Sequence, residues 1–215
     1  MKLYADPTSV NSRKVFAGLE LMDVGYEYVF VDHLAQANKK AEYLAINPNG
    51  TIPTLVDGAF VLWESNAILD YVADKNNADR YYPCDPELRA DIHRWQFWEI
   101  GHWFPSCYIY LIENIGKPLL HKLEPDLAVL EKEAPNWNKL AGILESRLSE
   151  NKWICGDTVT IADLSIAAPI HLHPWQGLPW APYPNLRRWM LDCVEDLDCW
   201  KNSDPTKILG LTDGK

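Results

Sequence analysis

The sequence predicts a small α/β domain followed by an all-helical domain. Strand-like and helix-like segments alternate over about the first 80 residues, whereas from Glu87 onward only the helical spacing of apolar residues is present. Nine of the ten tryptophans lie in this second part. A polar, proline-containing stretch, 76–86, separates the two parts. We therefore expect one domain over residues 1–77 and a second over 86–215.

In the first domain, the expected order of elements is β-α-β-α-β-β-α. Aromatic and β-branched residues favour the strands, and apolar residues three or four positions apart favour the helices. Asn47-Pro48-Asn49-Gly50 ends the second helix, and Asp57-Gly58 joins the last two strands as a hairpin. The expected strands are 2–5, 26–31, 51–56 and 60–63, and the expected helices are 13–22, 39–46 and 64–75.

In the second domain, helical spacing covers four long segments, at about 87–116, 123–150, 160–172 and 184–196. Thr160 is followed three residues later by Asp163, which is the pattern of a capping box with the acid shortened to Asp. We interpret this box as a structural feature and not as a catalytic one.

Composition excludes several classes of protein. The chain has 215 residues, of which 47% are hydrophobic and 23% charged, as in ordinary water-soluble globular proteins. A net charge of −10 disfavours a nucleic-acid binder, and no apolar run is long enough to cross a membrane. Five cysteines without a C-x-x-C pair indicate neither a disulfide framework nor a metal site. With no secretory leader visible, we expect a cytoplasmic protein with reduced thiols.

The first candidate site is the segment Thr51-Ile52-Pro53-Thr54. If the Ile52–Pro53 bond is cis, the backbone N–H and C=O of Ile52 are exposed, and an extended peptide can pair with them as an added strand. The alternative is an ordinary trans proline at the start of a strand, which base rates favour.

The second candidate site is the junction at Glu64-Ser65, where a strand ends and a helix begins. Free N–H groups at a helix N-terminus bind a carboxylate, and the Ser65 hydroxyl adds a donor. Glu64 is placed to face an ammonium group, so the pair suits an amino acid. The alternative is a helix start with no ligand.

The third candidate site is the polar turn 6–13, between the first strand and the first helix. Such turns lie at the carboxyl end of a strand, where open α/β sheets bind ligands. No cysteine is present in this turn, so the chain brings no thiol nucleophile of its own here.

In this order and spacing, T-I-P-T-L-V-D, W-E-S-N-A-I and the box from Gly156 to Asp163 resemble the cytosolic glutathione transferase family over about residues 1–200. The resemblance implies a thioredoxin-like first domain, a helical-bundle second domain and a cis bond before Pro53. It also implies a homodimer, with the first domain of one copy against the second domain of the other.

The resemblance also implies roles for individual residues. Backbone atoms at Ile52, beside Pro53, pair with the cysteinyl part of glutathione, and Glu64 and Ser65 hold its γ-glutamyl end. One of Asn38, Lys39 and Lys40 lies near the glycyl carboxylate. The residue that activates the thiol aligns with Ser9, as in serine-type classes, while Asn11 matches a bacterial subgroup with an S/T-x-N turn; backbone amides remain a third possibility.

An aromatic-rich segment, 94–104, is expected to line the site of the electrophilic substrate. The candidates for this pocket are Trp95, Trp98, His102, Trp103 and Tyr108. The alternative for each tryptophan is a place in the core between helices.

The function that follows is a glutathione S-transferase of the detoxifying kind. Glutathione is the cosubstrate, and its thiolate attacks a small hydrophobic, aromatic electrophile. One alternative is a glutathione-dependent lyase that cleaves ethers or removes halogen, or a disulfide-bond reductase. A second alternative, of another class, is a non-catalytic ligand-binding module on the same fold.

Overall fold

The computed structural model describes residues 1–211. The chain forms two compact units. The first contains Met1–Cys84 together with Asp198–Gly210, and the second contains Asp85–Leu197. The expected boundary near residues 77–86 is therefore present, but a stretch that we expected in the second domain returns to the first. This segment joins the first unit because it packs against the first helix, a long-range contact that no local sequence pattern predicts.

The first unit is built on a four-stranded sheet in the order β2-β1-β3-β4. β1 pairs in parallel with β2, and the β1–β3 and β3–β4 pairs are antiparallel. The strands are β1 Lys2–Ala5, β2 Glu27–Phe30, β3 Thr54–Asp57 and β4 Phe60–Trp63. Two of the four begin and end where the sequence predicted, and β3 begins three residues late, because the chain first makes a turn at Pro53.

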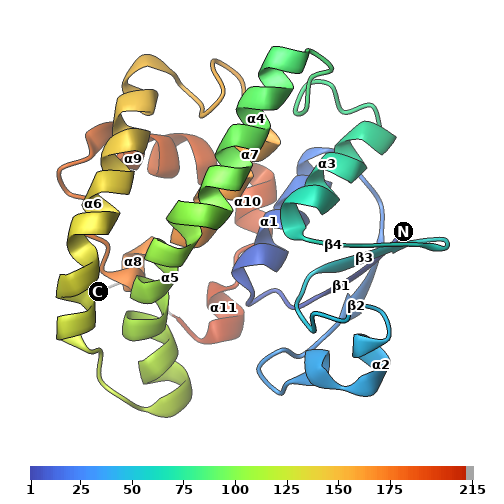
Figure 1. The fold of residues 1–215 in the computed structure, drawn as a ribbon, viewed down its shortest axis with the longest axis horizontal. Coiled ribbons are helices and arrows are strands. Elements are labelled where there is room, and N and C mark those ends of the chain that lie inside the picture. Colours follow the sequence, from blue (N-terminus) through green and yellow to red (C-terminus); the bar gives the residue numbers. More distant parts are fainter. Residues whose placement is uncertain (212–215) are drawn as a thin grey trace. The chain divides into compact units, whose positions relative to one another are not determined.

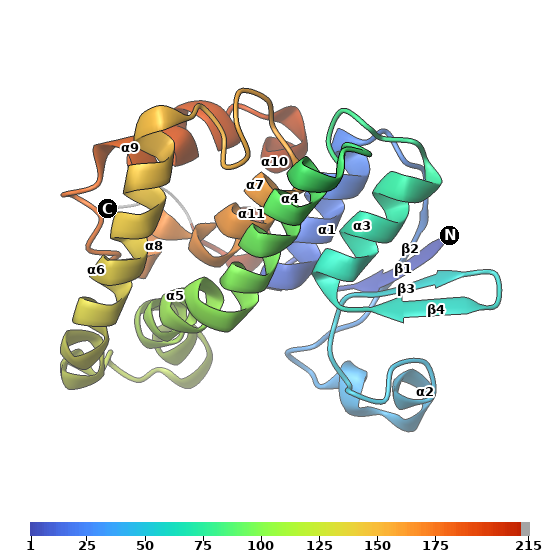
Figure 2. The ribbon, with the colours of Figure 1, turned by 45° about the horizontal axis from the view of Figure 1, so that its top comes forward.

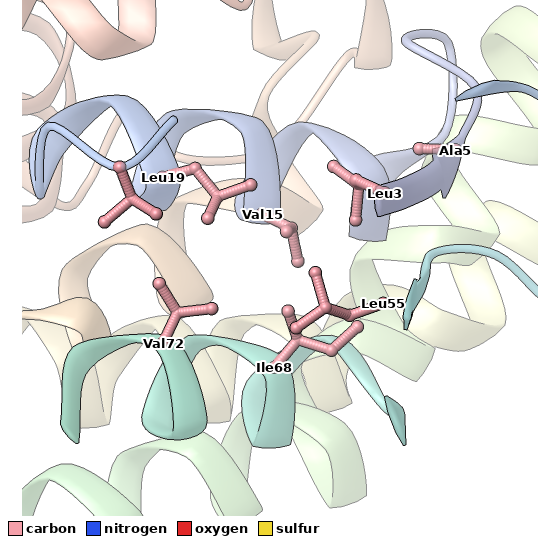
Figure 3. Close-up of a cluster of buried hydrophobic side chains, with 8 residues drawn as sticks. Leu3, Ala5, Val15, Leu19, Leu55, Ile68 and Val72 are labelled. Carbon is pink, nitrogen blue, oxygen red and sulfur yellow. The ribbon is translucent and has the colours of Figure 1, made fainter. Parts of the chain in front are cut away.

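Helices cover both faces of this sheet. α1 Val10–Leu21 and α3 Ser65–Lys75 lie on one face and α2 Ala41–Leu44 on the other (Figure 2). The core of the unit lies between the sheet and the α1–α3 pair. There, side chains of α1, α3, β1 and β3 point toward one another (Figure 3), and all are buried: Leu3, Ala5, Val15, Leu19, Leu55, Ile68 and Val72.

The second unit is helical throughout its regular structure, as predicted. Its helices are α4 Pro86–Trp98, α5 Phe104–Leu111, α6 Leu127–Glu150, α7 Ile161–Ala167, α8 His173–Gln176 and α9 Pro184–Arg188 (Figure 1). α10 Asp198–Asn202 and α11 Thr206–Leu209 belong to the returning segment. None of the helices among residues 1–211 is long and apolar enough to cross a membrane.

The expected helix at 87–116 is a run of α-helix interrupted by π-helical stretches. The stretches Glu99–Trp103 and Ile112–His121 flank α5. A π-helical turn holds an extra residue, so it shifts which side of the helix the following residues occupy. This shift matters for the aromatic residues, because three of the five candidates lie just before, inside or just after the first stretch.

The predicted capping box is present at the start of α7. The side chain of Thr160 accepts from the N3 backbone, and Asp163 Oδ2 accepts from Thr160 N at 2.8 Å. Asp163 Oδ1 also accepts from Ile154 N at 2.8 Å and from Trp189 Nε1 at 2.9 Å. Complete burial raises the pKa of this carboxyl to about 6, against the hydrogen bonds that lower it. The Thr160 hydroxyl is the fourth donor, to Oδ2 at 3.2 Å, and all four donors are structural, as we expected for the box.

Candidate functional site

The turn after β1 begins helix α1 with Ser9 as its N-cap. Ser9 has extended backbone angles, and its Oγ accepts a hydrogen bond from Ser12 N at 3.5 Å. Serine at this position supplies one of the acceptors that the first backbone N–H groups of a helix need. Because Oγ acts here as an acceptor, its own proton remains available for donation to a second group.

Asp6 fixes the shape of this turn from within. Its Oδ1 accepts from Thr8 N at 2.9 Å and from the Thr8 hydroxyl at 2.8 Å, and its Oδ2 lies 2.9 Å from His33 Nδ1. Burial alone would raise the pKa of Asp6, but the hydrogen bonds from Thr8 and His33 outweigh it and hold the pKa below its usual value. The turn is thus held by a buried carboxylate.

Asn11 and Ser65 join the first turns of α1 and α3. The Ser65 hydroxyl donates to Asn11 Oδ1 over 3.3 Å, although the two residues are 54 positions apart. In the described part of the chain, the Asn11 amide Nδ2 has no acceptor. Two of the three candidate regions of the first domain therefore meet in one place, with an unused amide donor beside the Ser65 hydroxyl.

Helix α3 begins without a side-chain cap. Its N-cap residue, Glu64, makes no capping hydrogen bond and has φ +76°, a conformation that non-glycine residues rarely adopt. By contrast, Asp85 caps α4 and Asp126 caps α6. The first backbone N–H groups of α3 consequently lack the acceptor that those helices supply, which leaves them available to an anion.

The Ile52–Pro53 peptide bond is cis, as the family resemblance implied. A polar network supports the segment from the side of α2. The hydroxyl of Tyr43 donates to Thr51 O at 2.7 Å, and the buried Asn47 donates to Thr51 O at 2.9 Å and to Thr54 Oγ1 at 3.0 Å. These contacts fix the backbone on both sides of Ile52.

The candidates for the glycyl carboxylate, Asn38, Lys39 and Lys40, differ in the hydrogen bonds that their side chains already make. Asn38 Nδ2 donates to Gly50 O at 2.8 Å, and Lys39 Nζ donates to the same oxygen at 2.7 Å. Gly50 has φ +59°, and a Cβ there would lie 3.0 Å from Asn38 O. Lys40 is exposed, and within residues 1–211 its ammonium group has no partner. Lys39 and Lys40 both keep their positive charge, but Lys40 is the one whose ammonium group is not already held by Gly50 O.

The aromatic candidates of the second unit lie on two sides of their helical run. Trp103 is 0% exposed, and its Nε1 donates to Ile166 O at 3.0 Å, so it belongs to the core. Trp95 is also buried. His102 is exposed, and Tyr108 is 42% exposed with its ring stacked on Phe104. The expectation of one aromatic wall thus divides: two tryptophans pack inside, and His102 and Tyr108 face outward.

Trp98 lies at the border between these groups. Its ring stacks on Trp103 at 6.0 Å and packs edge-on against Trp95 at 5.4 Å. Trp95 and Trp98 also line a hollow of about 410 Å³, a volume that suits a small molecule. The rest of its lining is mixed in character: Arg94, Ile143, Ser146, Arg147 and Glu150.

Several residues of the site were not singled out from the sequence. Asp6 and His33 hold the Ser9 turn, and Tyr43 and Asn47 hold the Ile52 segment. Lys14, 0% exposed, donates to Asn66 Oδ1 at 3.0 Å. Only Lys14 carried a usable signal, since a lysine on the side of a helix that also holds Val10 and Leu21 is out of place in an apolar stripe.

Comparison with known proteins identifies the family. A model of the glutathione S-transferase N-terminal domain matches residues 8–75, and a model of the C-terminal domain matches residues 108–196. Glutathione S-transferase GstB of Escherichia coli (strain K12) is 31% identical over 201 residues, covering 90% of this chain and 92% of that protein. The chain belongs to the glutathione S-transferase family.

Other glutathione S-transferases agree with this assignment. A probable glutathione S-transferase of rice, GSTF2, is 32% identical over 199 residues, or 90% of this chain and 91% of the rice protein. Glutathione transferase F7 from Populus trichocarpa superposes with a TM-score of 0.86 at 25% identity, covering 99% of both chains. A theta class enzyme from Xanthomonas axonopodis pv. citri, solved with glutathione bound, gives 0.85 at 27% identity and 98% coverage of both.

Proposed function

We propose that this protein is a glutathione S-transferase that ionises the thiol of bound glutathione at the Ser9–Asn11 turn. The thiolate then attacks a small, hydrophobic, aromatic electrophile. Glutathione is the cosubstrate of the family. The observation that carries the proposal is the Asn11–Ser65 hydrogen bond, which joins the thiol-activating turn to the helix start that receives the γ-glutamyl end.

The γ-glutamyl end is assigned to the start of α3. The free backbone N–H groups there and the helix dipole favour its carboxylate, and Glu64 pairs with its ammonium group. The Ser65 hydroxyl has one proton, so donating to the carboxylate means releasing Asn11 Oδ1. The cysteinyl part pairs with the backbone of Ile52 beside Pro53, in the manner of an added strand. Lys40 receives the glycyl carboxylate.

The chemistry requires only that the thiol be easier to ionise. A cysteine thiol with a pKa of about 8.5 is roughly 3% thiolate at pH 7. A hydrogen bond to a charged acceptor contributes about 1.5–3 kcal/mol, which lowers the pKa by about one to two units. Ser9 Oγ and Asn11 Nδ2 are the two available side-chain donors. The thiol proton leaves to solvent, a carbon–sulfur bond forms and the leaving group departs from the electrophile.

The electrophile is assigned to the exposed side of the aromatic run. Tyr108 and His102 present accessible rings, and Trp98 is half-buried beside them. Aromatic faces of this kind favour planar, apolar substrates. A glutathione-dependent lyase or disulfide-bond reductase would use the same thiolate. The reductase remains an alternative because the Asn11 amide has no acceptor among residues 1–211.

Two further properties belong to this proposal. Apolar side chains exposed on β4 (Phe60, Val61 and Trp63) and on α4 (Phe97) support a homodimer. Sedimentation at the mass of two chains is expected, and a monomer at micromolar concentration would contradict it. Five free cysteines support a reducing, cytoplasmic location.

The test of the proposal is a thiol titration. In Ser9→Ala, we expect the pKa of bound glutathione to rise by about one to two units while its affinity changes little, because the sulfur is the only glutathione atom that the hydroxyl is proposed to contact. Ultraviolet absorbance of the thiolate across a pH series measures this shift. If Asn11→Ala raises the pKa and Ser9→Ala does not, the amide is the activating group. If neither does, activation by these two side chains is wrong, and backbone amides are the remaining donors.

A further inference from the structure

The returning C-terminal segment contacts α1 through a buried pair, Arg13 and Trp200. The guanidinium carbon of Arg13 lies 4.2 Å from the centre of the Trp200 ring, and Arg13 Nη2 donates to Trp200 O at 3.1 Å. Trp200 is 2% exposed and Arg13 is 3% exposed. An arginine is almost never buried unless it is paired, so this contact is specific and not a chance approach of two surface groups.

The segment follows α1 along its length. Asn202 lies two residues after Trp200, and its Nδ2 donates to Glu20 Oε1 near the end of α1. α10 lies beside α1 in both views of the molecule (Figures 1 and 2). Residues close to the two ends of the chain therefore pack together inside the first unit.

Arg13 lies one helical turn after Ser9. Its backbone N–H donates to Ser9 O at 2.9 Å, so the two residues are linked by the first hydrogen bond of α1. The next residue, Lys14, connects the same helix to α3 through Asn66 at 3.0 Å. Two consecutive buried cations thus hold the first turns of α1, one against the C-terminal segment and the other against α3.

The position of this turn is what the proposed chemistry depends on. Donation from Ser9 Oγ or Asn11 Nδ2 to a sulfur anion requires their placement to within about 0.5 Å. A displacement of about 1 Å can reduce a rate by about 100-fold. A contact that fixes the start of α1 therefore acts on thiol ionisation without touching glutathione.

We propose that Trp200 is a positioning residue for thiol activation: by holding Arg13, it fixes the turn that carries Ser9 and Asn11. The inference rests on the proposed function of that turn. It assigns to the C-terminal segment a role in the reaction, in addition to its share in the stability of the first unit.

The experiment compares Trp200→Leu with Trp200→Phe. The Leu variant removes the ring that faces the guanidinium, and we expect the pKa of bound glutathione to rise by about one unit and kcat/KM at pH 6.5 to fall by about tenfold, with KM for glutathione within about twofold. Both variants keep the backbone carbonyl that accepts from Arg13, and only the Phe variant keeps a ring, so we expect both of its values to be near those of the parent protein.

Two sets of controls separate positioning from stability. Val72→Ala removes buried carbons from the same core but on α3, and it should lower Tm without shifting the pKa. If Trp200→Leu does not fold, Arg13→Met and Arg13→Lys test the same contact from its other side. We expect the Met variant to raise the thiol pKa and the Lys variant to raise it less.

The outcomes distinguish this inference from the proposed function. If the Trp200 and Arg13 variants lower Tm and leave the thiol pKa unchanged, while Ser9→Ala or Asn11→Ala raises it, the positioning role is wrong and the activating turn stands. If all of these variants leave the pKa unchanged, both are wrong.

Discussion

The polar residues of the first unit and the aromatic residues of the second are held in place in different ways. Ser9, Asn11 and Ser65 lie at helix starts and are held by hydrogen bonds: Ser9 Oγ accepts from Ser12 N, and the Ser65 hydroxyl donates to Asn11 Oδ1 across 54 positions. Trp98 and Trp103 are held by ring packing against each other, and Trp103 also donates to Ile166 O, 63 positions along the chain. The difference teaches that the proposed glutathione contacts come from polar side chains at helix starts, whereas the proposed electrophile contacts depend on how the rings of the helical unit pack.

The largest effect should come from the packed side of this comparison. Trp103→Ala removes a completely buried indole and leaves Ile166 O without its donor, so we expect a loss of about 3–5 kcal/mol in the free energy of unfolding. Tyr108→Ala, on the exposed side, should cost less than about 1 kcal/mol. Urea denaturation measures both. Equal losses of unfolding free energy in the two variants would contradict the assignment of Trp103 to the core and Tyr108 to the surface.

Ser65→Ala should weaken glutathione binding with little effect on stability. A hydrogen bond to a carboxylate contributes about 1.5–3 kcal/mol, so the dissociation constant should rise by roughly 10- to 150-fold. Isothermal calorimetry gives the constant directly, and Ser149→Ala on the surface of α6 serves as a matched control. Unchanged affinity in the Ser65 variant would rule out the start of α3 as the carboxylate site.

Asp6→Asn should make stability depend differently on pH. The folded pKa of Asp6 lies below its unfolded value, so its stabilising effect is present above pH about 4 and is lost as pH falls through the folded pKa. We expect the variant to be less stable by about 1–2 kcal/mol at pH 7, with a gap that narrows in acid. Denaturant titrations between pH 3 and pH 7 measure the gap. A constant difference would show that the charge is not responsible.

The smallest expected effect concerns the glycyl end. Lys40→Met removes an exposed charge, which contributes about 0.5–1 kcal/mol, so KM for glutathione should rise by about two- to fivefold. Lys39→Met is the comparison, because Lys39 already donates to Gly50 O. A larger rise of KM in the Lys39 variant than in the Lys40 variant would assign the glycyl carboxylate to Lys39.

Much of the fold was accessible from sequence, for identifiable reasons. Strands 2–5 and 60–63 are both present as predicted, the second because aromatic and β-branched residues follow the Asp57-Gly58 hairpin signal. The capping box at Thr160 and Asp163 is also confirmed, since its signal lies within four residues. Ser65 was singled out because a strand was predicted to end and a helix to begin there, and Ser9 was singled out from the family resemblance.

Three features of the structure could not be predicted from the sequence, each for a physical reason. A π-helical turn such as Glu99–Trp103 differs from α-helix by one inserted residue, which leaves no compositional mark, so the sequence could not tell which of the aromatic residues lie in the core, the alternative that we kept for each tryptophan. The support of Ile52 by Tyr43 and Asn47 depends on how α2 lies over the sheet. Arg13 and Trp200 meet across 187 positions, beyond the reach of any window of sequence.

The first unit is made of two stretches that lie far apart in the sequence, and this affects how it folds during synthesis. A ribosome releases Met1–Cys84 long before Asp198–Gly210, because the whole second unit must be translated between them. At about 5–20 residues per second, this interval is on the order of ten seconds. During that time α1 is on the nascent chain without the Trp200 indole beside Arg13, so the unit reaches its final form only after Asp198–Gly210 has been released.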